Sequence, residues 1–593
     1  MCDSELRAMH SATAAFRTHR EEGLRSIRER RNASLSATRS LPPEILGNIF
    51  QFRSYDPMSG TSFLIQYWFY RAQNCHRWLT FTHVCRHWRA VALQRGSLWN
   101  RLHCAMPEAP WRTYLIRSAN TLLTVHVDWA SAGGRRRKDI MDHCGRIEEL
   151  YLILPADGSD FDELDQMFLS PAPYLHTLHL KGGSGTWYHA LKDFIVHRSP
   201  ALRNLKLDDI YFPWGVDIAN IECLRLSAFE GDELSEVPVH RNARALHTFD
   251  DVLHTLQSAP SLKTLDLLGS YVLIPAPQIT SPIIHLPVNT LELSSFSKAP
   301  FPSSLVGILA AIIPTPVMDV NIAHNLEYLK VDASGVTALL AHIPDALRIH
   351  LSSRGKPGSP AVSTVLHLGV NTSWPNCHRL FFRLANKATA SPLFDSYGTN
   401  ISDGSPSVEV KYSGFPCCNV RSNSTERESL RSATLMLVRS LPDGHVDHLR
   451  HIALTGLCWT RTDVVSTFGQ ARGVEALTVY AVPNGFEEMT SVFVGDLLRV
   501  SASSPGIPAA SGASCVIFPA LRTLHLKWVD FGVRCDGGTT TLEEVFTLAL
   551  ESRKAMDCGL QSLDIEHCHL EDRFVELWCS IVPQVTVTAV STS

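Results

Sequence analysis

The chain has 593 residues, of which 45% are hydrophobic, and its 54 basic and 58 acidic residues give a formal charge of −4. This near balance argues against a protein whose main partner is a polyanion, and the apolar content excludes a largely disordered chain. At about 100–200 residues per domain, the length allows several domains or one small domain followed by a repeat array.

The cysteines and the apolar segments indicate the cellular setting. The 15 cysteines are odd in number and irregularly spaced, and residues 1–20 lack the apolar core of a secretory signal. We therefore expect reduced thiols and a cytoplasmic and/or nuclear protein. The most apolar run, Leu305–Val320, contains Pro314, Pro316 and Asp319. It is shorter than the ~20 apolar residues that span a bilayer, so we predict a buried element and no membrane contact.

Residues 1–39 are charged and have a helical pattern. Leu6, Met9, Ala12 and Phe16 follow a spacing of three and four, which Leu24 and Ile27 resume. The interleaved acidic residues argue against a transit peptide, and the apolar patches are short for a coiled-coil arm. A solvated lead-in helix is the favoured interpretation.

A second helix is predicted to begin in Ser40–Phe50, "SLPPEILGNIF". Pro42 and Pro43 suit a first helical turn, where a missing N–H group costs no hydrogen bond. The apolar residues that follow share one helical face. These are Ile45, Leu46, Ile49 and Phe50.

A third helix is predicted after an aromatic-rich loop at 54–79. One face would hold Phe81, Val84, Cys85, Trp88, Val91 and Ala92. Gly96 suits the position just after the helix, and Leu98 and Trp99 supply apolar bulk beyond it. Residues 104–144 are then expected to connect this helical module to the rest of the chain.

From about residue 145 a weak repeat, P-x-L-x-x-L-x-L, recurs. Its copies are Pro173–Leu180, Pro200–Leu207, Pro260–Leu267 and Pro519–Leu526, with variants that lack the proline from Ile147, Asn325, His448, Gly473 and Gly559. The final L-x-L predicts a short strand with one buried face, and amphipathic helices precede several copies. Because such a unit cannot bury its apolar face alone, stacked copies predict an irregular solenoid over 145–585.

The first of two resemblances concerns residues 40–103. The pieces "LPPEILGNIF", "HVCRHWRAVAL" and "SLWNRLH" occur in the order found in the F-box, a small helical module. With the Arg-rich lead helix, the chain looks like the F-box proteins of mushroom-forming fungi. The insertion at about 54–79 is a departure from the family pattern.

The second resemblance covers about 145–585, which looks like the irregular leucine-rich repeats that follow many F-boxes. In that family an Asn or Cys after the strand bonds the turn backbone. Here Gly183, Ile210, Ser270 and Val529 occupy this position, and only Cys568 keeps it. The fold class expected is an α+β or α/β solenoid: a small N-terminal helical F-box, then an irregular leucine-rich-repeat-like array of short parallel strands and helices.

These resemblances imply the substrate receptor of an SCF-type ubiquitin ligase. The F-box would dock the Skp-family adaptor, which links to a cullin, and the repeats would bind a target protein. Residues expected to bind the adaptor are Leu41, Pro42, Ile45, Ile49, Phe50, Val84, Cys85, Trp88, Leu98 and Trp99. Each also has an interpretation as core of the module, which stays open for Val84, Cys85 and Trp88 and for Leu98 and Trp99.

The sequence gives little indication of a metal site, a cofactor site or a catalytic site. There is no C-x-x-C pair for zinc and no nucleotide, hydrolase or metalloprotease motif, so we expect no metal, no cofactor and no catalysis. The basic run Gly133–Asp139 is interpreted as a surface loop, not a nuclear signal or nucleic-acid contact. A non-ligase scaffold and an unrecognised enzyme are the alternatives. The outward residues of the repeats are expected to form a solvated face: Arg203, Asn204, Lys206, Lys263, Thr264, Asp266, Arg522, Thr523 and His525.

Overall fold

The computed structural model describes two compact units, taken separately here: residues 1–154 with 170–177, and residues 155–169 with 178–593. We call them the N-terminal and the C-terminal unit. Within them the described residues are 3–35, 41–54, 77–155, 161–182, 188–227, 247–268, 279, 282–295, 303–313, 315, 318–325, 343–354, 365–374, 377–385, 407–416, 424–442, 445–455, 459–469, 471–481, 494, 517–535 and 540–588.

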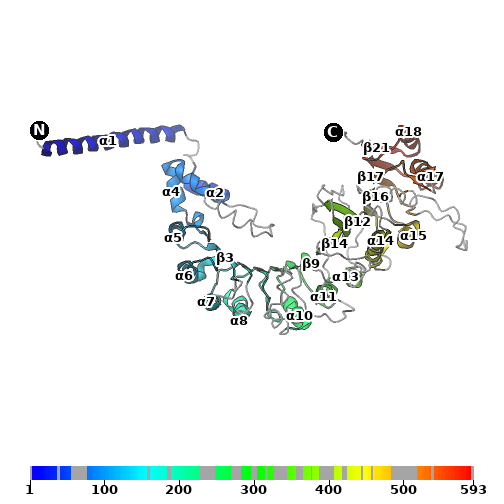
Figure 1. Ribbon diagram of the computed structural model, residues 1–593, viewed down its shortest axis with the longest axis horizontal. Coiled ribbons are helices and arrows are strands. Elements are labelled where there is room, and N and C mark those ends of the chain that lie inside the picture. Colours follow the sequence, from blue (N-terminus) through cyan, green and yellow to red (C-terminus); the bar gives the residue numbers. More distant parts are fainter. Residues whose placement is uncertain are drawn as a thin grey trace. The chain divides into compact units, whose positions relative to one another are not determined.

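The first described elements of the N-terminal unit are helical. α1 covers Asp3–Leu35 (Figure 1), and every side chain described in it is exposed. α2 covers Pro43–Ser54, and the Leu46 N–H donates to the Pro42 carbonyl 3.1 Å away. Most of the predicted aromatic-rich loop, residues 55–76, lies outside the described residues. The 3-10 helix η3 then covers Arg77–His83.

The next helix, α4, begins later than predicted. It covers Arg86–Gln94, and Cys85 is its N-cap, whose thiol accepts a hydrogen bond from the Trp88 N–H at 3.4 Å. The prediction of one continuous helical face from Phe81 is therefore wrong, because Cys85 has extended backbone dihedral angles. Gly96 follows α4 in the short 3-10 helix η4, Gly96–Leu98. A Cβ there would lie 3.0 Å from Thr121 Cγ2, so close approach is what requires glycine.

The expected connector contains regular structure. Its elements alternate as strand and helix, and β1, β2 and β3 pair in parallel. They are β1 (Arg101–His103), α5 (Glu108–Arg117), β2 (Leu123–Asp128), α6 (Gly134–Asp142), the 3-10 helix η5 (Cys144–Arg146) and β3 (Ile147–Ile153).

The basic run predicted as a surface loop is the first part of α6, so that prediction is wrong. The Arg136 guanidinium donates to the Cys104 carbonyl at 2.6 Å and the Met106 carbonyl at 2.5 Å. Arg137 is buried and donates to the Trp129 carbonyl at 3.1 Å. These arginines bond carbonyl groups in the segments just after β1 and β2, which explains why a basic segment is held against the chain as a helix here.

The C-terminal unit is a mixed α/β structure around one large, mainly parallel sheet. Strands β5, β6, β7, β9 and β11 pair successively in parallel, and β14 continues the order. β13 runs antiparallel between β14 and β12, and β15, β16, β17, β20 and β21 complete the parallel series. The bounds are β4 (Thr177–Lys181), β5 (Asn204–Asp208), β6 (Cys223–Ser227), β7 (Thr264–Leu268), β9 (Thr290–Ser295), β11 (Asp319–Asn325), β12 (Val365–Trp374), β13 (Cys377–Ala385), β14 (Ser407–Pro416), β15 (His451–Thr455), β16 (Ala476–Tyr480), β17 (Thr523–Lys527), β20 (Ser562–Glu566) and β21 (Gln584–Thr588).

Helices and short elements connect these strands. They are α7 (Phe161–Leu169), α8 (Tyr188–Asp193) with the π-helix η6 (Phe194–Arg198), α10 (Phe249–Gln257), β8 (Ile284–His285), α11 (Ser303–Ala311), β10 (Ile312–Ile313), α13 (Ile343–Arg354), α14 (Ser424–Arg439), η8 (His445–His448), α15 (Arg461–Phe468), β18 (Arg534–Cys535), β19 (Thr540–Thr541), α17 (Leu542–Ala555) and α18 (Asp572–Ile581). Among the described residues no helix is both long and apolar enough to cross a bilayer.

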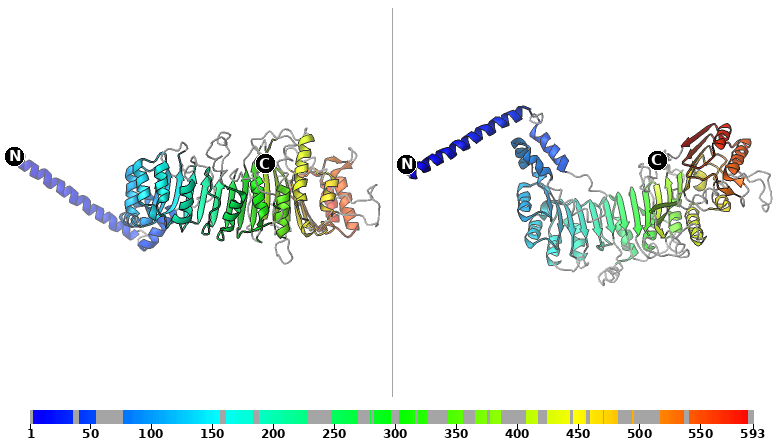
Figure 2. Two further views of the ribbon diagram at one scale, coloured as in Figure 1. Left: turned by 90° about the horizontal axis from the view of Figure 1, so that it is seen from below. Right: turned by 45° about the horizontal axis from the view of Figure 1, so that its top comes forward.

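The predicted L-x-L strands have the expected burial. Leu205 of β5 is in register with Leu224 of β6, Leu265 of β7 and Leu291 of β9, and all four are buried. Helices α10 and α11 lie on the same side of these strands (Figures 1 and 2), so the leucines form the core between the helices and the sheet. The variant predicted from Asn325 continues into residues outside the described part.

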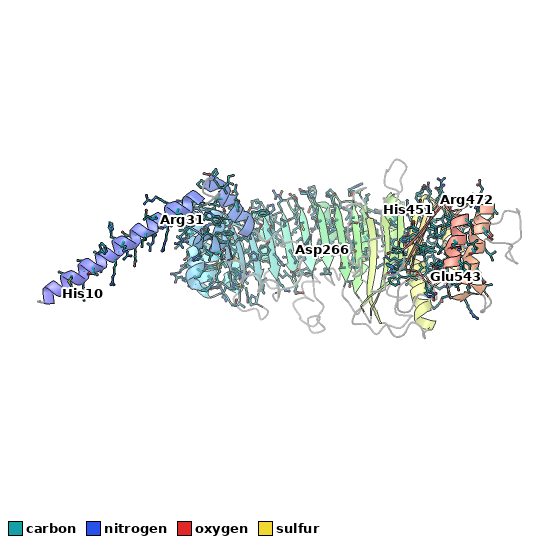
Figure 3. The ribbon with its side chains drawn as sticks, turned by 90° about the horizontal axis from the view of Figure 1, so that it is seen from above. His10, Arg31, Asp266, His451, Arg472 and Glu543 are labelled. Carbon is teal, nitrogen blue, oxygen red and sulfur yellow. The ribbon has the colours of Figure 1, made fainter. Side chains whose placement is uncertain are left out.

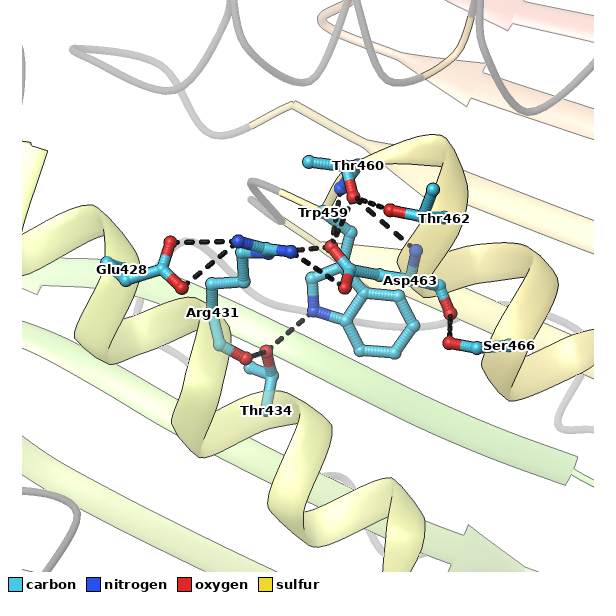
Figure 4. A network of polar contacts seen from close by, with 8 residues as sticks. All are labelled: Glu428, Arg431, Thr434, Trp459, Thr460, Thr462, Asp463 and Ser466. Carbon is cyan, nitrogen blue, oxygen red and sulfur yellow. Dashed lines mark hydrogen bonds and ion pairs between the residues drawn. The ribbon is translucent and has the colours of Figure 1, made fainter. Parts of the chain in front are cut away.

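A network of polar contacts joins α14 to α15 (Figure 4). The Arg431 guanidinium donates to both Asp463 carboxylate oxygens, at 2.6 and 2.9 Å. Asp463 and Thr460 form the capping box of α15, with an Asp463 carboxylate oxygen 2.8 Å from the Thr460 N–H. The Trp459 indole N–H donates to the Thr434 hydroxyl at 2.7 Å. One carboxylate thus serves both a helix cap and a bidentate ion pair.

We predict that this carboxylate contributes strongly to stability. Asp463→Ala should lower the free energy of unfolding by about 3 kcal/mol, since it removes both the bidentate partner of Arg431 and the carboxylate that caps α15. Glu428→Ala is the matched control, because it removes the exposed carboxylate that contacts the same guanidinium. The control should cost only about 0–1 kcal/mol, as exposed ion pairs do. Denaturant unfolding of both variants measures the difference, and equal losses would contradict the assignment.

Candidate functional site

The helical elements of residues 41–99 enclose a small aromatic core. The Phe50 ring is fully buried and packs against Phe81 at 4.8 Å and Trp88 at 5.1 Å between ring centroids. The buried Trp99 ring meets Trp78 edge-on at 4.8 Å, and its indole N–H donates to the Ala92 carbonyl at 2.9 Å. These rings consume the interior volume of the module, so other apolar side chains remain outside.

Apolar side chains that do not fit into this core line α2. Ile45 is 46% exposed, Ile49 48% and Phe52 82%. Their spacing of four and three places them on one face of the helix, which we call the α2 apolar surface. Phe52 was not among the residues predicted from the sequence, although its position three residues after Ile49 extends the same face.

The other predicted adaptor-binding residues divide between surface and core. Pro42, Val84 and Cys85 are exposed, and Leu41 and Trp88 are half-buried. Phe50, Leu98 and Trp99 lie inside, which matches the core interpretation of those three. They can support a partner only by holding the surface helices in place. Leu93, on α4, is a further exposed apolar residue that the sequence reasoning did not single out.

Residues 38–105 match the sequence model of the F-box-like family. The chain therefore carries an F-box-like domain, and the match includes α2, η3, α4 and η4. A comparison with curated proteins found no match.

The F-box-like domain is packed onto the element that follows it. Beyond its contacts inside the domain, the Trp99 ring meets the Tyr114 ring of α5 at 5.0 Å, and the Arg117 guanidinium lies 4.4 Å from the Trp99 ring centroid. The Asn100 side chain donates to the Leu122 carbonyl at 2.9 Å. The domain and the β1–α5–β2 segment thus share one core.

A second candidate surface, which we call the polar face, is the face of the C-terminal sheet opposite the in-register leucines of β5, β6, β7 and β9. There the register aligns Lys206, Arg225, Asp266 and Glu292 on β5, β6, β7 and β9. Asp266, labelled on the sheet in Figure 3, lies between Arg225 and Glu292 in this row, and its carboxylate is 3.9 Å from Arg225 Nε. Burial, and then the charge of Glu292, raise the pKa of Asp266 to about 7. The expectation of a solvated face is therefore wrong for Asp266, because side chains of adjacent in-register strands crowd it.

A buried polar cluster lies beside this row. The Asp208 carboxylate accepts hydrogen bonds from His179 at 2.6 Å and from Ser227, and Lys206 Nζ is 3.3 Å away. Burial alone would raise the pKa of Asp208, but the His179 contact and the Lys206 charge lower it to about 2. Burial lowers the pKa of His179. In a serine-hydrolase triad the serine hydroxyl donates to a histidine, which in turn contacts the carboxylate. Here the Ser227 hydroxyl donates directly to the Asp208 carboxylate, so the cluster is not such a triad.

Within the described ranges, no group of three or more His, Cys, Asp or Glu side chains is arranged to hold a metal ion. The polar face instead carries two adjacent positive groups, Lys206 and Arg225, beside two adjacent negative groups, Asp266 and Glu292.

We predict that Asp266 makes stability fall as the pH rises. Its pKa in the folded chain, about 7, is above the ordinary value of 3.8, so the folded state retains a proton that the unfolded state has released. The stability that this retained proton contributes is fully present below pH 3.8 and is lost as the pH rises through about 7. Asp266→Asn should therefore be more stable than the wild type at about pH 8, with a smaller advantage at about pH 5.

Thermal unfolding of the two proteins at both pH values measures this difference. Asp217→Asn is the control, because Asp217 is exposed and lies outside the strands. An Asp266→Asn advantage that does not change with pH would contradict the assigned protonation.

Proposed function

We propose that this chain is the substrate-recognition subunit of an SCF-type cullin-RING ubiquitin ligase. The observation that carries the proposal is the F-box-like match at residues 38–105, in a domain whose α2 apolar surface stays exposed. Domains of this family typically bind Skp-type adaptors, and the adaptor would link the chain to a cullin.

The α2 apolar surface supports adaptor docking on physical grounds. Ile45, Ile49 and Phe52 form a contiguous exposed apolar row on a helix, and the burial of such a row is the main favourable term in protein association. The aromatic core beneath the row, including Phe50, fixes the angle of α2. A rigid helix of this kind loses little conformational freedom on binding.

We further propose that the C-terminal sheet and its helices form an irregular leucine-rich-repeat-like solenoid. The in-register leucine rows support this interpretation. So does Cys568, whose thiol accepts from the Val529 N–H at 3.3 Å and lies 3.5 Å from the Leu526 carbonyl. Burial raises the pKa of Cys568 to about 12, so the thiol acts as a neutral bridge between turns. Gly183 and Ser270, at the corresponding position of other repeats, lie outside the described residues.

In this proposal the repeats bind a target protein through the polar face, and the chain itself makes no covalent bond. It would raise the effective concentration of a target lysine near a charged conjugating enzyme. Such a subunit needs no cofactor, and it would operate in the cytoplasm, the nucleus or both. The similarity to F-box proteins of mushroom-forming fungi stays a prediction.

Binding of the purified full chain to a Skp-family adaptor tests the proposal. We predict that the wild type binds and that the double variant Ile45→Glu, Ile49→Glu weakens binding at least about tenfold, or ~1.4 kcal/mol, because it places two charges on the contact row. Glutamate is a good helix former, so α2 should persist.

Ile116→Glu is the matched control, since Ile116 is an exposed isoleucine on α5 of the same unit. Calorimetry or biolayer interferometry measures the affinities, and circular dichroism checks folding. A folded wild type that binds no adaptor would contradict the receptor role and favour a scaffold without ligase function. A control that loses as much affinity as the double variant would remove α2 as the docking surface.

A further inference from the structure

The last strand of the C-terminal sheet, β21, has one open edge. It pairs with β20 in parallel, and no second strand partner exists for it in the described part of the chain. The Gln584 N–H donates to the Gln561 carbonyl at 3.1 Å, and the Thr588 carbonyl accepts from the His567 N–H at 3.0 Å. Because alternate residues of a parallel strand bond to one neighbour, the main-chain groups of Val585 and Val587 face the open edge.

The leucine rows of the core also end at β21. Val585 is in register with Leu563 of β20, and Val587 with Ile565. Leu563 and Ile565 are fully buried, whereas Val587 is 42% exposed and Val585 is half-buried. Within the described part of the chain, β21 therefore presents both main-chain groups without a strand partner and core side chains that are only partly covered.

β21 also lacks the features that keep edge strands apart. The sequence Gln584–Thr588 is QVTVT, without a charged residue or a proline. Its valines and threonines have high strand propensity. On α18, which packs beside β21, Leu577 is 40% exposed and adds apolar surface near this edge.

We propose that β21 is a self-association surface, on which β21 of a second copy of this chain pairs antiparallel with Thr586 opposite Thr586. This register places Val585 opposite Val587 of the second copy, so the outward main-chain groups of both valines find partners. A two-fold axis through the strand pair puts the valines of both copies on the same face of the joined sheet.

We expect a second copy of the chain to bind at this edge because the strand is complementary to itself. Because QVTVT carries no charge, pairing it with itself brings no like charges together. The symmetric pairing also extends the apolar rows by two valines from each copy, which a polar target peptide would not do. A pair of five-residue strands is a small contact, so we expect a reversible dimer whose population depends on concentration.

Sedimentation velocity of the full chain over a range of concentrations tests the inference. The wild type should show a monomer–dimer equilibrium, and Val587→Pro should weaken it at least tenfold. Proline removes an N–H at the open edge and no hydrogen bond to β20, so the sheet itself is retained. Leu548→Lys is the control: it changes an exposed leucine on α17 and should leave the equilibrium unchanged.

A charge-exchange experiment tests the register and does not depend on the proline variant. Thr586→Lys and Thr586→Glu should each weaken self-association, because residue 586 lies opposite itself. A mixture of the two variants should restore dimers that contain one copy of each, which mass photometry with one enlarged partner detects.

Three outcomes would overturn the proposal. One is a wild type that stays monomeric at every concentration, and another is a set of edge variants that dimerise as the wild type does. The third is an open edge that captures an extended target peptide as a monomer. Adaptor binding by the same proteins is measured alongside, so that a failure here is distinguishable from a failure of the proposed receptor function.

Discussion

The structure of the C-terminal unit depends on one constraint: a strand with two apolar side chains on one face can bury them only beside another strand in the same register. Leu205, Leu224, Leu265 and Leu291 satisfy this constraint in successive strands. Helices such as α10 complete the burial on the same side (Figure 2). The register in turn aligns the residues between the leucines, so the polar face is a consequence of how the core is built.

The same constraint on strand register explains the burial of Asp266 and the exposure of β21. On the polar face, alignment forces Asp266 between Arg225 and Glu292, and the carboxylate becomes buried although nothing in its own repeat requires it. At β21 no further strand of the described residues continues the alignment, and Val587 is exposed. In the F-box-like domain, large aromatic rings such as Phe50 and Trp99 fill the interior. The side chains of the α2 apolar surface therefore remain exposed.

Much of the local structure could be predicted from spacing. The Pro42–Pro43 helix start, the repeat strands and the helices that became α10 and α17 occur where the sequence indicates them. The errors have physical causes. The helix expected from Phe81 begins at Arg86, because Cys85 caps it with a thiol in an extended conformation. The basic run became part of α6, where its arginine side chains bond carbonyl groups just after β1 and β2, and the Cys104 carbonyl is 32 residues away from Arg136 in sequence.

The sequence alone determined the apolar face of the L-x-L strands and the F-box pattern at residues 40–103, because these depend on neighbours within a few residues. Only the tertiary structure decided which apolar side chains of the F-box-like domain stay outside. The single apolar face predicted for Ile45, Leu46, Ile49 and Phe50 is split in the structure: Ile45 and Ile49 are exposed, and Leu46 and Phe50 are buried. The buried side of α2 is the one on which the ring of Phe50 meets Phe81 and Trp88. The partners of Asp266 and the open edge of β21 were likewise decided by strand pairing, since contacts between residues far apart in the chain have no local signal.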